Sequence, residues 1–325
     1  MKRSILALAV LLSALPAAAQ SYGVVRISVC NLRQTAAYDA EMVSQALLGT
    51  PVHILQVSAG NNWPEIQGPD GYTGCVHPAG IQILTKAEYS AWNAAEKLVV
   101  TALTGTVFTA PSKKAATVSD VVGGDRLRFL GSAGRFWKVG FPDGREGYLA
   151  KCDGEPESRW RRSLDRSAEA ILRTARSMTG FPYLWAGMSP KGMDCSGFVR
   201  ATLAMHDIII PRDASQQAPK GERIELFHDG AAAPDLSPLL PGDLLFFGRR
   251  GGDGTKERVS HVAFYLGGGQ FIHSLGLVTV ASLDPSAPDY DAYNTGRLLF
   301  ASRILPFIDR QEGLCTTETN PYYNE

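Results

Sequence analysis

Three adjacent residues, Asp194, Cys195 and Ser196, are the part of this 325-residue chain best suited to chemistry. They precede an apolar run, residues 198–209, that predicts a helix. A free thiol has a pKa of about 8.5 and is mostly protonated at neutral pH, so a nucleophilic cysteine needs its anion stabilised. Asp194 is a favourable N-cap residue, and the N–H groups and dipole of a helix start would favour a thiolate at Cys195. A buried core cysteine is the alternative, and this segment alone leaves both interpretations open.

Two histidines provide a candidate base for that thiol. His261 and His273 lie in apolar, strand-like segments joined by the glycines of residues 267–269, a pattern that predicts a β-hairpin. A single histidine in a strand is more often a hydrogen-bonded structural residue. A hairpin, however, would bring both imidazoles to one face, and a base oriented by a third group is the arrangement that activates a cysteine.

The first residues of the chain predict export. Residues 1–3 are basic, residues 5–15 are apolar, and the alanines of residues 17–19 offer a small-residue cleavage site. We therefore expect a signal peptide over residues 1–19, cleaved after Ala19, and a mature protein in the periplasm or outside the cell. No later segment is long and apolar enough to span a bilayer, so we expect no integral membrane segment in the mature chain.

That compartment gives meaning to the cysteines. The chain has five of them, Cys30, Cys75, Cys152, Cys195 and Cys315. An oxidising compartment would tend to pair four and leave one free, and Cys195 is the natural candidate for the free thiol. Pairing Cys30 with Cys75 and Cys152 with Cys315 would join neighbouring segments, although the sequence does not exclude other pairings.

Charge and residue spacing exclude several classes of function. The chain has 32 Lys and Arg against 32 Asp and Glu, so its net charge is zero, and the charges are interspersed. This balance gives no electrostatic case for a nucleic acid or an anionic membrane as a partner. The sequence also has no metal-ligand spacing and no phosphate-binding loop, so we expect no cofactor and no metal.

The first half of the chain contains an internal repeat of short, strand-like runs broken by Gly, Pro and Asn. The corresponding residues are Trp63 with Pro69-Asp70-Gly71, and Trp137 with Pro142-Asp143-Gly144. Such a repeat predicts two small β-barrels, one over residues 20–85 and one within residues 86–155. Aromatic and apolar residues at helical spacing predict a connecting helix over residues 86–100.

Residues 156–310 have the pattern of a mixed α/β domain. Apolar residues between 160 and 178 fall on one helical stripe that stops at Gly180, and strand-like runs follow in the second half of the segment. The tail, residues 311–325, lies outside this pattern, and Cys315 is its only expected attachment.

Several short motifs follow one another in the order and with the character of the NlpC/p60 cell-wall cysteine peptidases. They are Tyr183-Leu184-Trp185-Ala186-Gly187, Asp194-Cys195-Ser196-Gly197-Phe198, Pro241-Gly242-Asp243-Leu244, Ser260-His261-Val262 and His273. This resemblance covers about residues 157–306, and the barrels resemble bacterial SH3-like domains. It implies an α+β protein: a papain-like cysteine peptidase domain preceded by two small SH3-like β-barrels. Ala186 departs from the pattern, since relatives often have glycine there.

What the resemblance implies is hydrolysis of the bond between D-glutamate and the following diamino acid in peptidoglycan stem peptides. Cys195 would attack the carbonyl, His261 would act as base and then as acid, and His273 would orient His261. The hydroxyl of Tyr183 and the backbone N–H of Cys195 would stabilise the oxyanion, and Trp185 would form a wall of the site.

Relatives with this architecture cut short peptides whose L-alanine amino end is free. An ammonium needs carboxylates and hydroxyls around it, and the matching positions here are Asp194, Ser196, Glu41 and Tyr72. The expected partners are therefore released L-Ala-γ-D-Glu-diamino acid fragments, with either diaminopimelate or lysine as the diamino acid. Trimming such fragments belongs to cell-wall turnover or recycling.

Two other functions stay open at the level of sequence. A protein that binds cell-wall peptides through its barrels would have a silent peptidase domain, although the intact Cys195, His261 and His273 argue against it. An amidase or acyltransferase on the same Cys–His scaffold would keep these three residues but would not need the residues that read an ammonium.

Overall fold

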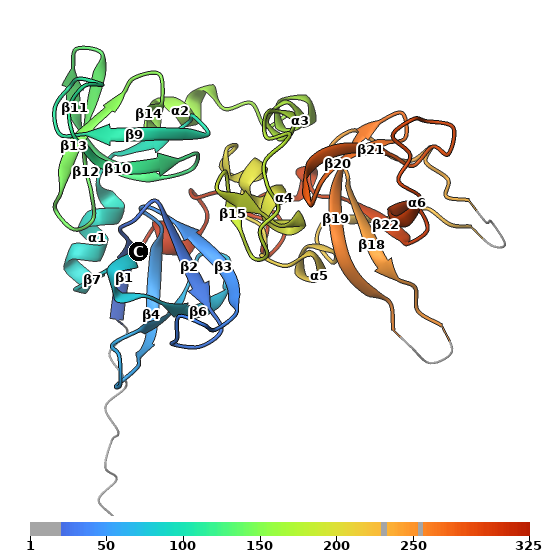
Figure 1. The fold of residues 1–325 in the computed structure, drawn as a ribbon, viewed down its shortest axis with the longest axis horizontal. Helices are drawn as coiled ribbons and strands as arrows, with labels where there is room; N and C mark the ends of the chain where they lie inside the picture. Colours follow the sequence, from blue (N-terminus) through green and yellow to red (C-terminus); the bar gives the residue numbers. More distant parts are fainter. Residues whose placement is uncertain (1–20, 229–232, 253–255) are drawn as a thin grey trace, which may run out of the picture.

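The computed structural model describes residues 21–228, 233–252 and 256–325 of the chain. The expected signal peptide lies outside these residues. None of the helices found in the described ranges has the length and apolar character needed to cross a membrane. Figure 1 shows two strand-rich bodies on one side, coloured blue and green, and a mixed body of helices and strands, coloured yellow to red, on the other.

The first strand-rich body, which we call the first barrel, is a seven-stranded sheet. Its strands are β1 (Ser21–Val25), β2 (Val29–Arg33), β3 (Met42–Leu47), β4 (Pro51–Val57), β5 (Pro64–Gln67), β6 (Thr73–Val76) and β7 (Ile81–Leu84), with the 3-10 helix η1 (Pro78–Gly80) before β7. They pair antiparallel in the order β3-β2-β6-β5-β4-β1-β7. Side chains of a strand alternate between its two faces, and the inward ones, among them Val25, Val52 and Ile66, form a buried core.

Helix α1 (Lys86–Ala94) connects the two strand-rich bodies. Its start is fixed by a capping box between Thr85 and Glu88. Its aromatic residues Tyr89 and Trp92 are buried, as expected for packing residues. The helix ends earlier than predicted, because residues from Lys97 onward form a fully buried strand of the next sheet.

The second strand-rich body, the second barrel, repeats the first in strand number. Its strands are β8 (Lys97–Val100), β9 (Thr104–Phe108), β10 (Thr117–Val122), β11 (Arg126–Ala133), β12 (Phe136–Gly140), β13 (Glu146–Ala150) and β14 (Gly154–Pro156), in the order β10-β9-β13-β12-β11-β8-β14. The two barrels dock through hydrogen bonds at the backbone of Leu48. Arg126 N donates to Leu48 O at 2.9 Å, and Leu48 N donates to Asp125 Oδ1 at 3.1 Å.

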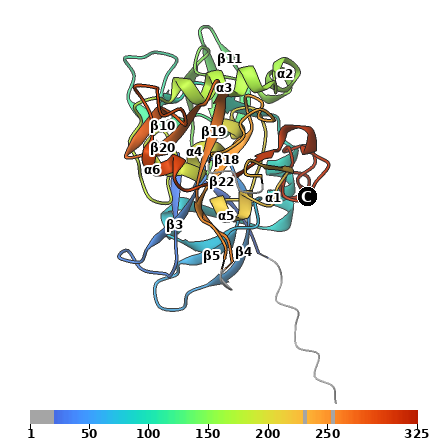
Figure 2. The ribbon, with the colours of Figure 1, turned by 90° about the vertical axis from the view of Figure 1, so that its right-hand side faces the viewer.

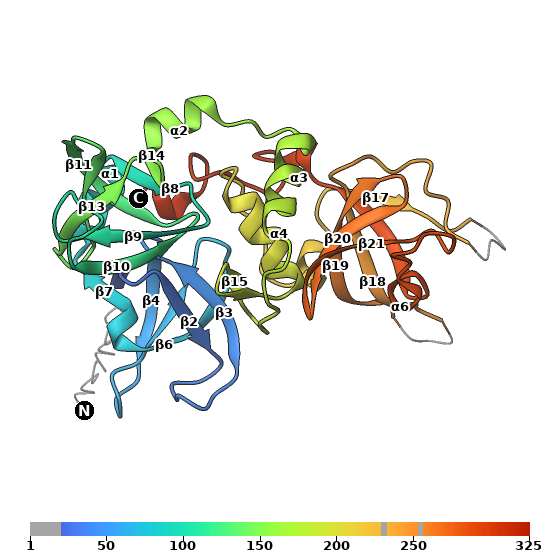
Figure 3. The ribbon, with the colours of Figure 1, turned by 45° about the horizontal axis from the view of Figure 1, so that its top comes forward.

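The mixed body consists of helices and one six-stranded sheet, and its first helix packs against strands β8 and β14 of the second barrel. Its helices are α2 (Glu157–Ser163), α3 (Ala168–Ser177), α4 (Cys195–Ala204), α5 (Ala214–Gln217) and α6 (Ala292–Thr295). Its sheet has the order β17 (Glu222–Glu225), β22 (Leu298–Arg303), β18 (Leu244–Arg249), β19 (Arg258–Gly267), β20 (Gln270–Leu275) and β21 (Leu277–Ser282). A small hairpin of β15 (Met188–Ser189) and β16 (Gly192–Met193) precedes α4. Figure 3 shows α3 and α4 side by side between the sheet and the barrels. Phe198, Phe264 and Ile272 belong to the core that joins α4 to the sheet.

Two predicted helices are shorter in the structure. The apolar stripe of residues 160–178 is divided into α2 and α3, because Leu164 and Ser167 have extended backbone conformations and Ser167 caps α3. The apolar run 198–209 stays helical only to the end of α4, after which Asp207 takes a φ of 57° and the chain turns. In both cases hydrophobic spacing continued past the point where the backbone left the helix.

The tail returns to the first barrel, so the prediction that Cys315 is its only attachment is wrong. Asn320 Nδ2 donates to Pro69 O at 2.8 Å, and Tyr322 Oη donates to Gln67 Oε1 at 2.8 Å. Figures 1 and 2 both place the end of the chain beside α1. The last residues, including the 3-10 helix η3 (Pro321–Tyr323), therefore connect the mixed body to the first barrel.

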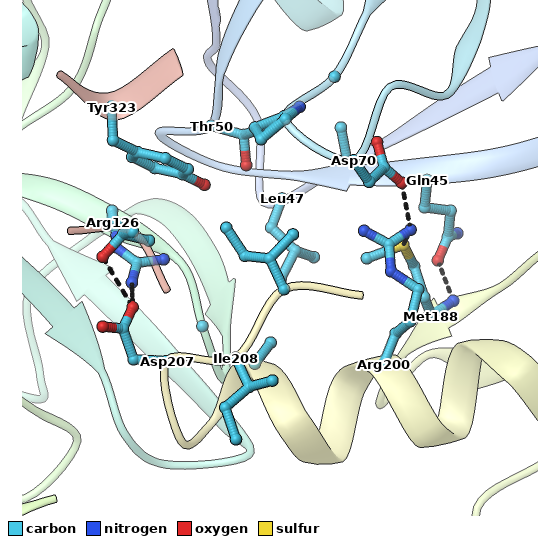
Figure 4. Close-up of a pocket in the computed structure, with 17 residues that line it drawn as sticks. Gln45, Leu47, Thr50, Asp70, Arg126, Met188, Arg200, Asp207, Ile208 and Tyr323 are labelled. Carbon is cyan, nitrogen blue, oxygen red and sulfur yellow. Dashed lines mark hydrogen bonds and ion pairs between the residues drawn. The ribbon is translucent and has the colours of Figure 1, made fainter. Parts of the chain in front are cut away.

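A small cavity of about 80 Å³ marks the point where both barrels, the mixed body and the tail meet (Figure 4). Arg200 of α4 pairs with Asp70 of the first barrel at 2.7 Å. Arg126 of the second barrel pairs with Asp207 at 3.2 Å, and the ring centroid of Tyr323 lies 5.5 Å from the same guanidinium. The first of these ion pairs fixes the first barrel against α4, and the second fixes the second barrel against the turn that follows α4.

All five cysteines are free thiols, so both predicted disulfides are wrong. Cys30 and Cys75 lie on neighbouring strands, but Cys30 points into the core of the first barrel whereas Cys75 is on the half-buried outer face. Cys152 is exposed in the second barrel. Cys315 lies elsewhere, with its Sγ accepting from Asn320 Nδ2 at 3.3 Å.

Candidate active site

Cys195 is the first residue of α4, as the sequence predicted, and Asp194 is the N-cap. Asp194 Oδ1 accepts the N–H of Gly197 at 2.7 Å, and Oδ2 accepts the N–H of Ala186 at 2.9 Å. Ala186 has a φ of 60°, a conformation that glycine adopts without strain and alanine does not. The capping carboxylate thus holds both the start of the helix and the preceding loop, and fixes the position of Cys195.

The two predicted histidines meet on neighbouring strands of the sheet. His261 on β19 and His273 on β20 are 3% and 2% exposed, and His261 Nε2 lies 2.8 Å from His273 Nδ1. The predicted proximity of the two imidazoles is therefore confirmed. Because Nε2 of His261 is engaged with His273, Nδ1 is the ring nitrogen of His261 that is left for a group in the pocket that Cys195 and His261 both line.

The protonation of these groups differs from the expectation based on the helix start. Burial, and then the Asp194 carboxylate, raises the pKa of the Cys195 thiol to about 11, although backbone N–H groups and the Arg212 guanidinium act in the opposite direction. Burial also lowers the pKa of His261 well below its usual 6.5 and that of His273 to about 4. The free site therefore holds a neutral thiol and neutral imidazoles.

A pocket of about 380 Å³ opens at Cys195. Its lining includes all but one of the predicted site residues, namely Glu41, Tyr72, Tyr183, Trp185, Asp194, Cys195, Ser196 and His261. The exception, His273, lies behind His261. Since Glu41 and Tyr72 come from the first barrel and the others from the mixed body, the two bodies build one pocket. Figures 1 and 3 show β3 of the first barrel beside β15.

A hydrogen bond crosses between these bodies at the rim of the pocket. Trp185 Nε1 donates to Glu41 Oε1 at 2.9 Å, although Trp185 is 60% exposed. Tyr183 is half-buried, and burial, followed by the nearby Cys195 and Asp194, raises the pKa of its hydroxyl to about 12. At neutral pH Tyr183 is therefore a hydrogen-bond donor in the pocket, as an oxyanion partner must be.

Asp194 is engaged in a way that the sequence did not reveal. Arg212, 1% exposed, binds it through Nη2–Oδ2 at 2.6 Å and Nη1–Oδ1 at 3.1 Å. The same guanidinium donates to Ser196 Oγ at 2.8 Å, and Ser196 Oγ in turn donates to Asp194 Oδ1. Arg212 thus balances the charge of Asp194 and ties Ser196 into the same network, although both residues also line the pocket. Their predicted role in binding an ammonium stays a prediction.

Asp213 is a pocket residue that the sequence analysis missed. Burial raises its pKa, against the opposing effect of Arg212, and Asp213 in turn helps to raise the pKa of Tyr72 after burial. In the sequence Arg212 and Asp213 follow Pro211 between a helix and a strand, which is typical of a surface turn. No local signal distinguished them, because their partners are distant in the chain.

Within the ranges covered by the structure, no group of three or more His, Cys, Asp or Glu side chains is arranged to hold a metal ion. The side chains of the pocket itself offer a buried thiol, an imidazole that contacts a second imidazole, a tyrosine hydroxyl, and the two carboxylates of Glu41 and Asp213.

Comparison with known proteins agrees with this geometry. Residues 180–295 match the model of the NlpC/P60 family, and residues 32–81 match that of the bacterial dipeptidyl-peptidase Sh3 domain. A gamma-D-glutamyl-L-lysine dipeptidyl-peptidase of Bacillus cereus is 30% identical over 242 residues, which are 72% of this chain and 67% of that protein. This chain belongs to the NlpC/P60 family. A gamma-D-glutamyl-L-lysine dipeptidyl-peptidase of Bacillus subtilis is 36% identical over 129 residues, and this match covers 40% of the chain and 38% of that relative.

A solved structure extends the likeness beyond the peptidase domain. An NlpC/P60 family protein of Bacillus cereus superposes with a TM-score of 0.70 at 26% identity, covering 88% of this chain and 100% of the other. The match thus includes the strand-rich region as well as the mixed body. The predicted family and fold class, a papain-like domain after SH3-like barrels, are both confirmed.

Proposed function

We propose that this chain is a cysteine peptidase that hydrolyses the γ-D-glutamyl–diamino acid bond of peptidoglycan stem fragments whose N-terminal L-alanine is free. The observation that carries the proposal is the shared pocket, in which Cys195 and His261 meet Glu41 and Tyr72 of the first barrel. Two relatives whose names describe a dipeptidyl-peptidase acting at gamma-D-glutamyl-L-lysine support the choice of bond.

The proposed reaction starts from a neutral thiol. His261 Nδ1 takes the proton from Cys195 as Sγ attacks the γ-carbonyl carbon of D-glutamate. Negative charge develops on the carbonyl oxygen, where the hydroxyl of Tyr183 and the backbone N–H of Cys195 donate hydrogen bonds. His261 then gives its proton to the leaving amine, and water releases the dipeptide from the thioester. A positioned acid–base group of this kind contributes about 10²–10⁴-fold to the rate.

His273 is a positioning residue in this scheme. For Nδ1 of His261 to accept a proton, its Nε2 must carry one, and Nε2 then donates to His273 Nδ1 across the 2.8 Å contact. The same bond holds the ring of His261 and stabilises the imidazolium that forms when the thiol loses its proton.

Recognition of the amino end is assigned to the first barrel side of the pocket. Among the residues that the structure describes, Glu41 and Asp213 are the pocket carboxylates that form no ion pair with an arginine, in contrast to Asp194. The raised pKa of Asp213 has burial as its first cause, and an ammonium ligand would offset that cost. A peptide still amide-linked at its L-alanine has no such charge, so the enzyme should act on released fragments.

A matched pair of substrates tests this function. L-Ala-γ-D-Glu-L-Lys and its N-acetylated form are incubated with wild type, Cys195→Ala, Glu41→Gln and Asp39→Asn, and the products are identified by mass. We expect wild type to release L-Ala-D-Glu from the free peptide and to cleave the acetylated one far more slowly. Cys195→Ala should release nothing, and Glu41→Gln should lose much of the preference for the free amine.

Asp39→Asn is the matched control, because Asp39 is an exposed carboxylate two residues before Glu41 and does not line the pocket. Full activity of Cys195→Ala would reject the cysteine mechanism, and a protein that binds both peptides without cleaving either would instead be a binding module. Equal cleavage of the free and acetylated peptides would reject the ammonium recognition alone.

The cellular setting belongs to the same proposal. A basic start, an apolar run and three small residues support a signal peptide over residues 1–19 and a mature enzyme in the periplasm or outside the cell. The proposal also includes domain boundaries at residues 20–85, 86–155, 156–310 and 311–325. Mass analysis of the secreted protein would give the cleavage site directly.

A further inference from the structure

Arg297 is a basic residue of the pocket that the proposed reaction leaves without a role. It lies between α6 and β22 and lines the pocket together with Ser260 and His261. Its Nη1 donates to Ser260 Oγ at 3.1 Å, and its Nε donates to Asn294 Oδ1 at 3.0 Å. The guanidinium is therefore held beside the residue that directly precedes the catalytic base, and these two bonds use only some of its N–H donors.

In the described part of the protein, the guanidinium of Arg297 has neutral hydrogen-bond partners. In the part of the chain that the structure describes, no carboxylate forms an ion pair with it, whereas Arg212 is paired with Asp194 and Arg200 with Asp70. Its two hydrogen-bond acceptors are the hydroxyl of Ser260 and the side-chain amide of Asn294, and both groups are neutral. A half-buried guanidinium held in a fixed orientation and lacking an anionic partner is suited to a carboxylate ligand, which it can bind with two parallel hydrogen bonds.

Charged residues of opposite sign reach the pocket from different elements. Glu41 comes from the first barrel and Asp213 from the start of α5, whereas Arg297 follows α6. Figures 1 and 3 show α6 on the side of the mixed body away from the first barrel. The electrostatic effects agree with this division. Arg297 acts on the two imidazoles, where it helps to lower the pKa of His261 after burial and the effect of His273.

We propose that Arg297 binds the α-carboxylate of the leaving diamino acid, so that the enzyme recognises a free carboxyl end of the peptide as well as a free amino end. This inference rests on the proposed function. His261 protonates the leaving nitrogen, and the carbon attached to that nitrogen carries the α-carboxyl group. A cation anchored next to His261 is thus placed for this carboxylate, while the α-carboxylate of D-glutamate belongs to the acyl part bound toward the first barrel.

The inference predicts which fragments the enzyme accepts. A peptide that continues beyond the diamino acid has this carboxyl group in an amide, which offers no charge to Arg297. The preferred substrate is then a tripeptide with both ends free. Its supply requires a reaction of the carboxypeptidase class to remove the residues that follow the diamino acid, in addition to the amidase-class reaction that frees L-alanine.

Three synthetic peptides test the proposal with the full-length protein. The first is L-Ala-γ-D-Glu-L-Lys with a free carboxyl end, the second is its C-terminal carboxamide, and the third has a free carboxyl end but an amide on the α-carboxyl of D-glutamate. We expect wild type to cleave the first with kcat/KM about ten- to a hundredfold above the second, the range of a charge-assisted hydrogen bond. Arg297→Met should abolish this preference, and Arg297→Lys should retain part of it.

Arg258→Met is the matched control, because Arg258 is an exposed arginine at the start of β19 that does not line the pocket, and this variant should keep the full preference. Equal cleavage of the first two peptides by wild type would overturn the inference. The inference would also be overturned if Arg297→Met slowed cleavage of the first two peptides by the same factor, because that result indicates a structural role through Ser260. It would be overturned as well if Arg297→Met changed the discrimination against the third peptide and not against the second. If wild type cleaves none of the three, the proposed function itself fails and the inference falls with it.

Discussion

Replacing Arg212 by methionine removes one half of a buried ion pair at the start of α4. The side chains of Arg212 and Asp194 are 1% and 9% exposed, and the guanidinium holds both carboxylate oxygens, at 2.6 and 3.1 Å. Methionine retains much of the apolar volume but leaves the buried carboxylate without its counter-charge. Breaking a pair of this kind costs about 3–5 kcal/mol. The loss of stability should be concentrated in α4, because Asp194 is the N-cap of this helix, which carries Cys195.

Hydrogen exchange of the α4 amides in the full-length protein measures the free energy of local opening. At about 1.4 kcal/mol per factor of ten, the expected loss corresponds to exchange about two to four orders of magnitude faster in Arg212→Met. Arg173→Met is the control, since the pair of Arg173 with Glu169 is exposed on α3 and should contribute little. The double variant Asp194→Asn with Arg212→Met should be less destabilised than the sum of the single variants, because it leaves no unpaired buried charge.

Asp194 and Arg212 should shift the pKa of the Cys195 thiol in opposite directions. Asp194 raises the pKa of Cys195 and Arg212 lowers it. Arg212→Met should therefore raise that pKa further and slow the alkylation of Cys195 by iodoacetamide at mildly alkaline pH, whereas Asp194→Asn should lower the pKa and speed alkylation. Shifts of the same direction in both variants, or strictly additive effects on hydrogen exchange, would refute this account of the pair.

Three further predictions follow from the site and the junction. His273→Ala should lower kcat with little change in KM, and less severely than Cys195→Ala does. His273→Asn should recover part of the lost kcat, because its amide oxygen can accept a hydrogen bond from His261. An unchanged kcat in His273→Ala would contradict the positioning role. Burial lowers the pKa of His273 to about 4 from its usual 6.5. As the pH falls through this window the unfolded chain binds protons that the folded chain does not, so thermal stability should fall, and by less in His273→Asn. Asp207→Asn removes a buried charge that is paired with an arginine of the second barrel and with arginines of the mixed body. This variant should have a lower melting temperature, and its KM for the free-amino tripeptide should rise more than its kcat falls. The exposed Glu169→Gln should change neither the melting temperature nor the KM.

The parts of the site that could be predicted from the sequence depend on short spacings. An N-cap aspartate followed by a cysteine locates a helix start within one turn, and a glycine turn between His261 and His273 locates a hairpin. These local patterns are decided by the backbone of a few residues. The structure accordingly keeps Cys195 at the start of α4 and the two imidazoles 2.8 Å apart.

The parts that could not be predicted depend on which distant residues pack together. The sequence gives no sign that Arg212 will neutralise Asp194, or that Asp213 will enter the pocket with Tyr72. The sign of the shift in the pKa of Cys195 was also beyond local reasoning. A helix start favours the thiolate, but at 9% exposure the cost of burying a charge outweighs it, and burial is a property of the assembled fold.

The proposed division between catalysis and recognition makes the docking of the first barrel a condition for specificity. Glu41 is exposed, and its hydrogen bond to Trp185 is too exposed to hold two bodies together by itself. More buried contacts between residues that do not line the pocket do this instead: Arg200 with Asp70 at 2.7 Å, and the backbone of Met188 with Gln45 Oε1 at 2.8 Å. The thiol and its histidines belong wholly to the mixed body and need none of these contacts to react. Loosening the first barrel should therefore leave the chemistry in place while removing the carboxylates that select a free amino end, so selectivity depends on the junction more than the reaction does.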